Sequence, residues 1–340
     1  MLFLACLFLG CASEASDSAA LPNAYALTGG TVVGHGKADV EVADGRIVAV
    51  GTVSQTAERI DVSGRFLAPA LVDSHVHLAY LPEAAAMADG GIAAAVDLAS
   101  PLSFLSELPA RPHVLASGPM ITAVDGYPTQ SWGSNGYGLE CADAAAVRAA
   151  VQQVAAAGAR VVKVPVESGG LDDAELVAAV DEAHARGLKV AAHALSDDEA
   201  ARAARAGVDV LAHTPVAALS KKTVALWSDR AVISTLRAFG GSKTAVSNLR
   251  ALRAAGATVL YGTDFGNTTT PGIDGAELAL LTEAGLDGAA ILGAATSVPA
   301  TFWGLEGFGR IEVGAEAHIL VLDADPMVDP TTLSRIVRVL

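Results

Sequence analysis

From about residue 67 onward, short apolar segments alternate with longer segments of helical periodicity, and this alternation limits the fold more than any other feature. Eight strand candidates follow one another, from "FLAPALVD" at residues 66–73 to "ATVLYGTD" at residues 257–264. Helical segments between them, such as "DDEAARAARAG", start with Asp and end in Gly, which suits helix polarity. Eight such units in about 235 residues predict a closed, parallel (β/α)8 barrel of the TIM type over residues 67–304.

An open, doubly wound sheet is the alternative architecture. It is less favoured because no Gly-rich phosphate-binding fingerprint follows the first strand candidate. In either case the chain belongs to the α/β class.

The two flanks of this region have a different pattern, with short β-branched runs separated by Gly and Asp. The pattern covers residues 22–66 and returns after residue 305 in "GRIEVGAEAHILVLDADP". We expect residues 22–66 and 305–340 to pair into one small β-sandwich built from both ends of the chain.

The first residues, "MLFLACLFLGC", form an apolar run that is shorter than the ~20 residues of a membrane-spanning helix. The run has no preceding Lys or Arg, but "FLGC" resembles a bacterial lipoprotein cleavage box. We expect residues 1–21 to be a signal or lipoprotein-type leader. The protein would then be exported, either to the periplasm or to a membrane through a lipid on Cys11.

Charge and cysteine content exclude other classes. A formal net charge of −15 is the wrong sign for a protein that binds the phosphate backbone, so no nucleic acid partner is expected. Outside the leader Cys141 stands alone, so no structural disulfide is expected. The remaining expectation is a small-molecule substrate, and the oligomeric state is left open.

Six polar side chains occur at or near the carboxyl ends of the predicted strands, which is the face where such barrels carry their active sites. They are His75 and His77 after the first strand, Lys163 in the fourth, His193 and His213 at the ends of the fifth and sixth, and Asp264 at the end of the eighth. Each has a structural explanation when taken alone, such as a hydrogen-bonded core histidine or a helix cap. Their joint occurrence at one rim favours a site.

The residue types make chemical sense as a metal site. Imidazole and carboxylate groups are usual ligands of zinc and similar ions, whereas a protonated lysine, with a reference pKa near ~10.4, cannot bind a metal. Lys163 therefore needs a special role. A lysine that captures carbon dioxide as a carbamate becomes an anion with two oxygens, which can bridge two metals.

The ordered motifs "LVDSHVHL", "VVKVPVESGG", "AAHA", "LAHTP" and "YGTDFG" resemble the amidohydrolase superfamily, in its imidazolonepropionase-like and Xaa-Pro-dipeptidase-like branch. The resemblance extends from about residue 25 to the C-terminus. It implies two divalent metal ions, expected to be Zn²⁺. His75 and His77 would bind one ion and His193 and His213 the other. A carboxylated Lys163 would bridge them, and Asp264 would contact the first ion and transfer a proton.

The resemblance also implies the reaction, which is hydrolysis by a hydroxide that bridges the metals. We expect the cleaved bond to be the C–N bond of a dipeptide, an N-acyl amino acid or a cyclic amide. Deamination is disfavoured because Leu195 and Ser196 stand where the deaminases of the superfamily carry a Glu. Esters, lactones and phosphotriesters are alternative substrates of the same site. A non-catalytic exported binding lipoprotein is a third alternative, although none of the six ligands is missing.

Substrate contacts are predicted in the segment "ITAVDGYPTQSWGSNGYGLE" after the third strand candidate, through Tyr127, Trp132 and Tyr137. The alternative is that these aromatic side chains only pack the loop against the barrel. Arg237 is a candidate for binding a substrate carboxylate, with a surface salt bridge as the alternative.

Overall fold

The computed structural model describes residues 22–55 and 57–340. The predicted leader, with Cys11, lies outside the described residues. Within the described part, no helix is both long enough and apolar enough to cross a membrane. Cys141 is a free, buried cysteine.

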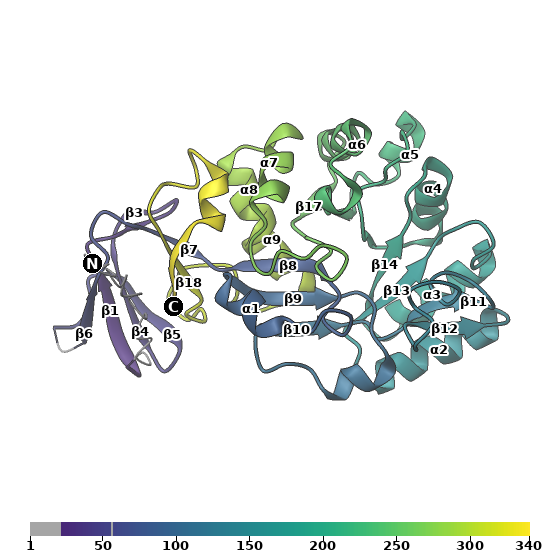
Figure 1. Ribbon diagram of the computed structural model, residues 1–340, viewed down its shortest axis with the longest axis horizontal. Coiled ribbons are helices and arrows are strands. Elements are labelled where there is room, and N and C mark those ends of the chain that lie inside the picture. The colour runs from purple at the N-terminus through teal and green to yellow at the C-terminus, as the bar shows by residue number, and fades with distance from the viewer. Residues whose placement is uncertain (1–21, 56) are drawn as a thin grey trace, which may run out of the picture.

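Parallel strands form the centre of the molecule (Figure 1). They belong to two sheets with strand orders β10-β9-β8 and β13-β14-β15-β16-β17. The strands are β8 (Leu71–Val76), β9 (Ile92–Asp97), β10 (His113–Ala116), β13 (Val161–Pro165), β14 (Lys189–His193), β15 (Val210–Leu211), β16 (Ala231–Ile233) and β17 (Thr258–Leu260). The parallel α/β architecture predicted from the alternating pattern is therefore confirmed.

The two sheets are joined directly on one side. The Ser74 amide donates to the Tyr261 carbonyl and the Asp264 amide donates to the His75 carbonyl, both at 2.9 Å, so the end of β17 lies against β8. On the other side β10 and β13 do not pair. Among the described strands the ladders thus form no single closed barrel, and closure into eight strands stays a prediction.

The segment between β10 and β13 differs from the predicted loop. The two ends of the predicted loop form strands β11 (Met120–Ala123) and β12 (Gly138–Cys141), which pair in parallel with each other. Strand β11 packs beside β13. Periodicity did not reveal these strands because each is only four residues long and the segment between them is rich in Gly. This pair of strands anchors both ends of the loop that carries Tyr127 and Trp132.

Helices and 3-10 helices follow the parallel strands: those up to α6 lie between them, α7, α8 and α9 come after β17, and η3 lies between β18 and β19. They are α1 (Ala84–Asp89), α2 (Ala144–Ala156), α3 (Asp173–His184), α4 (Asp197–Ala206), α5 (Lys221–Ala225), α6 (Lys243–Ala254), α7 (Gly275–Glu283), α8 (Gly288–Ala295), α9 (Ser297–Trp303), η1 (Leu102–Ser106), η2 (Arg237–Phe239) and η3 (Pro330–Ser334). The sequence determines several helix ends locally. Capping boxes begin α3 and α4, and α4 ends at Gly207, whose φ of 97° favours glycine.

Two further sheets are built from both ends of the chain and lie together at one end of the molecule (Figure 1). One has the order β5-β4-β1-β6 and the other β19-β18-β7-β2-β3. Their strands are β1 (Ala24–Thr28), β2 (Thr31–Val32), β3 (Gly36–Lys37), β4 (Asp39–Ala43), β5 (Arg46–Gly51), β6 (Glu58–Asp61), β7 (Phe66–Pro69), β18 (Ile319–Leu322) and β19 (Ile336–Val339). Apolar side chains of both sheets, including Leu27, Val42 and Ile319, share one hydrophobic cluster.

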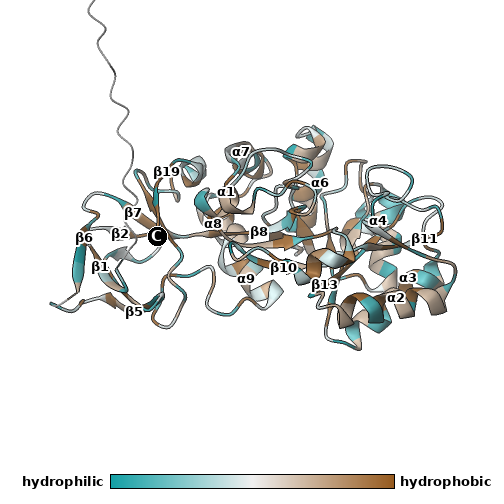
Figure 2. Ribbon diagram, turned by 60° about the horizontal axis from the view of Figure 1, so that its bottom comes forward, coloured by the Kyte–Doolittle hydropathy of each residue, from teal (hydrophilic) through white to brown (hydrophobic). Residues whose placement is uncertain are grey.

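A second and larger hydrophobic cluster joins the parallel strands to the surrounding helices. Figure 2 shows hydrophobic residues along β8 and β13 and hydrophilic residues on the outer helices such as α2 and α3. Burying this apolar surface stabilises the strand ends from which the candidate site is built.

Candidate metal centre

The six predicted ligands come together in one buried cluster at the carboxyl ends of the parallel strands. In the register of β13 and β14, Lys163 pairs with Ala191 and Pro165 with His193. Lys163 and His193 thus point to the same face, with Lys163 deeper in the sheet. All six side chains are buried, and Lys163 and His75 have no exposed surface at all.

His75, His77 and Asp264 form the tightest group. The Nε2 atoms of the two imidazoles lie 3.2 Å apart, and Oδ1 of Asp264 lies 3.6 Å from His75 Nε2 and 3.1 Å from His77 Nε2. One ligand atom from each residue lies within 4.8 Å of the others, so the group can hold a metal ion. A His–His–carboxylate set is a usual ligand set for divalent transition metals.

His193 and His213 lie beside this group. The ring centroid of His213 lies 4.5 Å from that of His75 and 4.9 Å from that of His193. His193 Nε2 also lies 3.3 Å from Oε1 of Glu167. The geometry therefore places four histidines in one cluster, and the division of these ligands between two metals stays a prediction.

Hydrogen bonds from the far side of the ring orient two of the imidazoles, those of His75 and His213. Nδ1 of His75 donates to the Ala212 carbonyl at 2.8 Å, which leaves Nε2 free to face the cluster. Nδ1 of His213 lies 3.1 Å from the Thr235 hydroxyl. These partners hold the ring nitrogens in the orientation that a ligand needs.

The loop after β17 carries Asp264 in an unusual backbone conformation. Asp264 has a φ of 54°, in the left-handed region, and its carboxylate accepts a hydrogen bond from Asn267 at 3.0 Å. Two residues later, Gly266 has a φ of 116° and lies so close to His77 that an added Cβ would stand 2.7 Å from the His77 Cβ. Local strain of this kind is tolerated where the surrounding structure holds a functional group in place.

Burial and neighbouring charges set the protonation of the cluster. Burial, followed by the Lys163 charge, lowers the pKa of His75 well below its usual value, and burial likewise lowers the pKa of His213. Burial alone would raise the pKa of Asp264, but His75 and His77 more than offset it and lower that pKa to about 2. Neutral imidazoles and an ionised carboxylate are the forms that bind metals.

Lys163 is the most exceptional residue of the cluster. Its amine has no hydrogen-bond partner among the described residues, although the side chain is completely buried. Burial lowers the pKa of this amine to about 7. A buried amine with a lowered pKa, beside the imidazoles, fits the predicted carbamate, because only the neutral form of an amine reacts with carbon dioxide.

A cavity of ≈ 290 Å³ opens onto the cluster. Predicted ligands and uncharged side chains line it, namely His77, Met120, Tyr127, Trp132, Lys163, His193, His213, Ala238, Phe239, Asp264 and Asn267. Tyr127 stacks on His193 at 5.0 Å, Trp132 contacts His77 at 5.5 Å and Phe239 contacts His213 at 4.9 Å, measured between ring centroids.

Comparison with known proteins agrees with this arrangement. The model of the amidohydrolase family matches residues 66–339. The chain belongs to the amidohydrolase family. This confirms the resemblance inferred from its ordered motifs, and it shows that the protein is a hydrolase of a family that acts on small molecules.

Relatives of this amidohydrolase include an uncharacterized protein of Mycobacterium tuberculosis (strain ATCC 25618 / H37Rv), which is 29% identical over an alignment of 315 residues that covers 79% of this chain and 82% of the relative. A solved Xaa-Pro dipeptidase with bound methionine in its active site shares the fold with a TM-score of 0.82 and 19% identity, covering 93% of this chain and 98% of the other. A prolidase complexed with N-methylphosphonate-L-proline has a TM-score of 0.79 and 22% identity, covering 93% and 97%.

Two predicted substrate contacts of the amidohydrolase lie outside the cavity lining. Tyr137, at the end of the loop, is buried and packs with Met120 and Ala99. Arg237 donates to the hydroxyl of Thr270 and forms an ion pair with Asp274, whose side chain is buried rather than on the surface. A substrate-binding role for either residue stays a prediction.

Nothing in the sequence indicates that Met120 and Phe239 line the cavity, whereas Asn267 belongs to "GNTTTPGID", the segment after Asp264 that is expected at the rim. Met120 and Phe239 carry no chemical signal, because apolar residues near strand ends are usually core.

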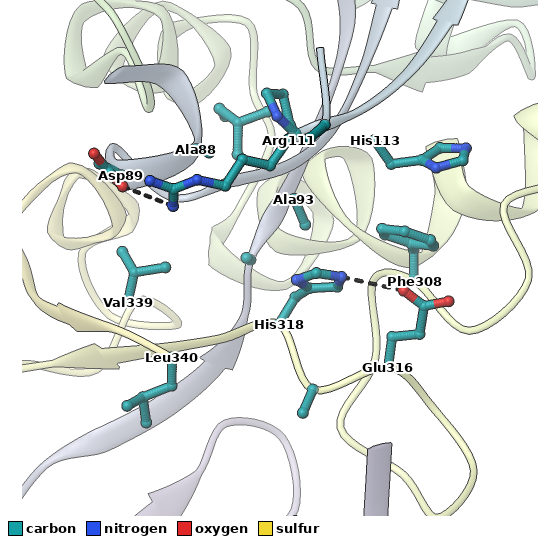
Figure 3. A pocket seen from close by; sticks show the side chains of 15 residues that line it. Ala88, Asp89, Ala93, Arg111, His113, Phe308, Glu316, His318, Val339 and Leu340 are labelled. Atoms are coloured by element: carbon teal, nitrogen blue, oxygen red, sulfur yellow. Dashed lines mark hydrogen bonds and ion pairs between the residues drawn. The ribbon is translucent and has the colours of Figure 1, made fainter. Parts of the chain in front are cut away.

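A larger cavity of ≈ 500 Å³ lies near the starts of β9 and β10, next to β18 and β19 (Figure 3). His318 stacks on Phe308 there at 5.0 Å and pairs with Glu316, while Arg111 pairs with Asp89. None of the six predicted ligands lines this cavity, so size alone does not locate the active site of the amidohydrolase.

Proposed function

We propose that the protein is a binuclear metal-dependent amidohydrolase that cleaves a C–N bond in a small substrate. One observation carries the proposal. The Lys163 amine is buried and without a hydrogen-bond partner among the described residues, and it lines the same cavity as His77, His193, His213 and Asp264. Burying an amine without a hydrogen-bond partner lowers the stability of the folded protein, which is a reason to look for a functional role. A carbamate on Lys163 would convert it into a bridging ligand.

The residues present fit two divalent ions. His75, His77 and Asp264 would hold one ion, His193 and His213 the other, and the Lys163 carbamate both. When bound, such ions, expected to be Zn²⁺, lower the pKa of water and polarise the bond to be cleaved.

Asp264 is proposed to act as the proton carrier. Its carboxylate faces the cavity and is ionised at neutral pH, because its pKa is about 2. It therefore accepts the proton of the attacking water and passes it to the leaving nitrogen. Asn267, which donates to Oδ1 of Asp264 at 3.0 Å, holds the carboxylate in position.

The cavity supports a small amide as substrate. A volume of ≈ 290 Å³ accommodates a dipeptide, an N-acyl amino acid or a cyclic amide, and Tyr127, Trp132 and Phe239 provide flat apolar walls. The structural neighbours named Xaa-Pro dipeptidase and prolidase support this class. Esters, lactones and phosphotriesters would reach the same attacking group, so they serve as the comparison in the test.

The experiment is a panel of matched amides and esters, assayed with zinc-loaded wild type and with Asp264→Asn. We expect amide hydrolysis by the wild type and a loss of about 10²–10⁴-fold in kcat in the variant, which is the usual size of a proton-transfer contribution. Asp198→Asn, on the exposed face of α4, serves as the control and should retain full activity. A wild type that cleaves only esters would overturn the C–N assignment.

A further inference from the structure

The aromatic wall of the cavity carries one hydroxyl group, that of Tyr127, whose proton is not donated to any residue that the structure describes. We propose that Tyr127 donates a hydrogen bond to the oxyanion that forms at the scissile carbonyl, and that Trp132 holds the tyrosine in the orientation this requires. The inference rests on the proposed hydrolase function and assigns a catalytic role within it.

The position of Tyr127 is the first observation. Its ring stacks on that of His193, with centroids 5.0 Å apart and an interplanar angle of 29°. It lines the same cavity as Lys163 and Asp264. Tyr127 therefore borders the space that a substrate bound at the cluster would occupy.

The direction of the hydrogen bond between Trp132 and Tyr127 is the second observation. Nε1 of Trp132 donates to the Tyr127 hydroxyl at 2.8 Å. An indole nitrogen only donates, so the tyrosine oxygen is the acceptor and its own proton remains available. Within residues 22–55 and 57–340, this hydroxyl makes no other hydrogen bond.

Trp132 is itself held on several sides. Its ring contacts His77 at 5.5 Å, Tyr80 at 5.7 Å and Tyr137 at 5.4 Å. These contacts restrict the indole, and its N–H in turn restricts the tyrosine. Trp132 is therefore a positioning residue, and it polarises the phenol as a better donor because hydrogen bonds in a chain strengthen one another.

The other polar group of the wall is already engaged. Asn267 donates from its side-chain amide to Asp264 at 3.0 Å. Tyr127 thus supplies the uncommitted hydroxyl donor among the neutral residues that line the cavity. With a reference pKa near ~10, a tyrosine is protonated at neutral pH and can donate to a developing negative charge.

The role requires no transfer of the tyrosine proton. In hydrolysis the water oxygen bonds to the carbonyl carbon, the C–N bond breaks, and the water protons go to the leaving nitrogen and to solvent. Tyr127 keeps its proton throughout and only lowers the energy of the negatively charged oxygen. Its contribution is therefore expected in the transition state rather than in binding of the substrate.

The test compares Tyr127→Phe with wild type by two measurements on zinc-loaded protein. The first is kcat and KM for the best amide of the panel. The second is binding of a methylphosphonamidate, a tetrahedral analogue of that amide, by calorimetry. Removing one oxyanion donor costs about 10²–10³-fold in kcat in comparable sites. We expect a loss of about 10²-fold in kcat, an equal loss of phosphonamidate affinity, and an unchanged KM and zinc content.

Two further variants test the positioning role. Trp132→Phe keeps an aromatic ring but removes the N–H, and it should give the same pattern at an intermediate size. Tyr25→Phe is the control, because it deletes a tyrosine hydroxyl in β1, outside the cavity lining. It should match the wild type.

The outcomes separate this inference from the proposed function. If the wild type cleaves no amide but Tyr127→Phe still loses phosphonamidate affinity, the amide assignment fails and the role of Tyr127 stands. Equal phosphonamidate affinity in wild type and Tyr127→Phe, whether high or undetectable, overturns the role of Tyr127. A variant that raises only KM would also overturn it, because the tyrosine would then be a binding wall.

Discussion

At the scale of single residues, Lys163 has an unusual environment for a lysine. Its side chain is fully buried, and the carboxylates of Asp264 and Asp97 only partly offset the effect of burial on its pKa, which falls to about 7. An unmodified lysine in this place would be neutral over much of the physiological pH range. Since a neutral amine is the form that attacks carbon dioxide, the environment that lowers the pKa also prepares the residue for modification.

This leads to a prediction about metal loading. Metal-free protein is mixed with zinc at a fixed concentration of dissolved carbon dioxide, and the loading rate is followed from pH 6 to pH 9. The rate should rise up to about pH 7 and level off above it, because the amine is then already neutral. A lysine with the ordinary pKa would keep gaining about tenfold per pH unit towards pH 10.

Lys163→Met, which cannot form a carbamate, serves as the control and should show no dependence on carbon dioxide. A wild-type rate that does not respond to carbon dioxide would contradict the assignment of Lys163.

At the scale of elements, the loop after β17 determines where Asp264 and His77 lie relative to each other. Gly266 has no Cβ, which permits both its φ of 116° and the close approach to His77. The Gly266 amide also donates to the Thr268 carbonyl at 2.8 Å, so the turn is fixed by its own backbone.

Gly266→Ala is predicted to disturb the metal centre and not only the stability. The positive φ should cost about 1–3 kcal/mol of unfolding free energy, and the new methyl group should displace His77. Urea unfolding measures the first effect and zinc content the second.

Gly158→Ala is the matched control, because Gly158 has a φ of 103° but open space around its Cβ direction. It should lose similar stability and keep its zinc. Normal zinc content in Gly266→Ala would show that the loop does not position His77.

Helix α7 supplies the second element-scale prediction, through Glu277. Its two carboxylate oxygens accept hydrogen bonds from the backbone amides of Leu236 and Arg237, at 3.0 and 2.7 Å. These bonds fix the turn after β16. Burial raises the pKa of this carboxyl to about 7, despite those hydrogen bonds. Because the folded-state pKa lies above the usual value of 4.5, its contribution to stability is full below pH 4.5 and is lost as the pH rises through 7.

Glu277→Gln should therefore flatten the pH dependence of stability. Measured by urea unfolding of metal-free protein, the decline between pH 4.5 and 8 should be smaller than in wild type by about 3 kcal/mol, from a shift of roughly 2.5 pH units at 1.36 kcal/mol each. Glu283→Gln, at an exposed position of the same helix, should leave the decline unchanged. Parallel curves for wild type and Glu277→Gln would contradict the raised pKa.

At the scale of the whole molecule, the parallel strands bring together side chains that are almost 190 residues apart in sequence, such as His75 and Asp264. This much could be predicted, because carboxyl ends of parallel strands share one rim and because metal ligands are recognisable residue types. The parallel α/β class followed from the alternating periodicity for a similar reason, since that signal recurs along most of the chain.

Other features could not be read from the sequence because they depend on contacts between distant loops. The strands β11 and β12 are too short for a periodic signal, and the pairing of Arg237 with Asp274 depends on how η2 meets the start of α7. The hydrogen bond from Trp132 to Tyr127 depends on the local turn that the loop adopts. In each case the residue was recognisable, but its partner was determined by packing.

The most direct test of the central claim is the metal content per chain of wild type and of Lys163→Ala, each purified in bicarbonate and assayed for amide hydrolysis. We predict about two divalent ions per wild-type chain, as a bridged binuclear site requires, with loss of both metal and turnover in the variant. One metal or none in the wild type, or a variant that keeps its metal and its activity, would contradict the bridging lysine and with it the binuclear hydrolase.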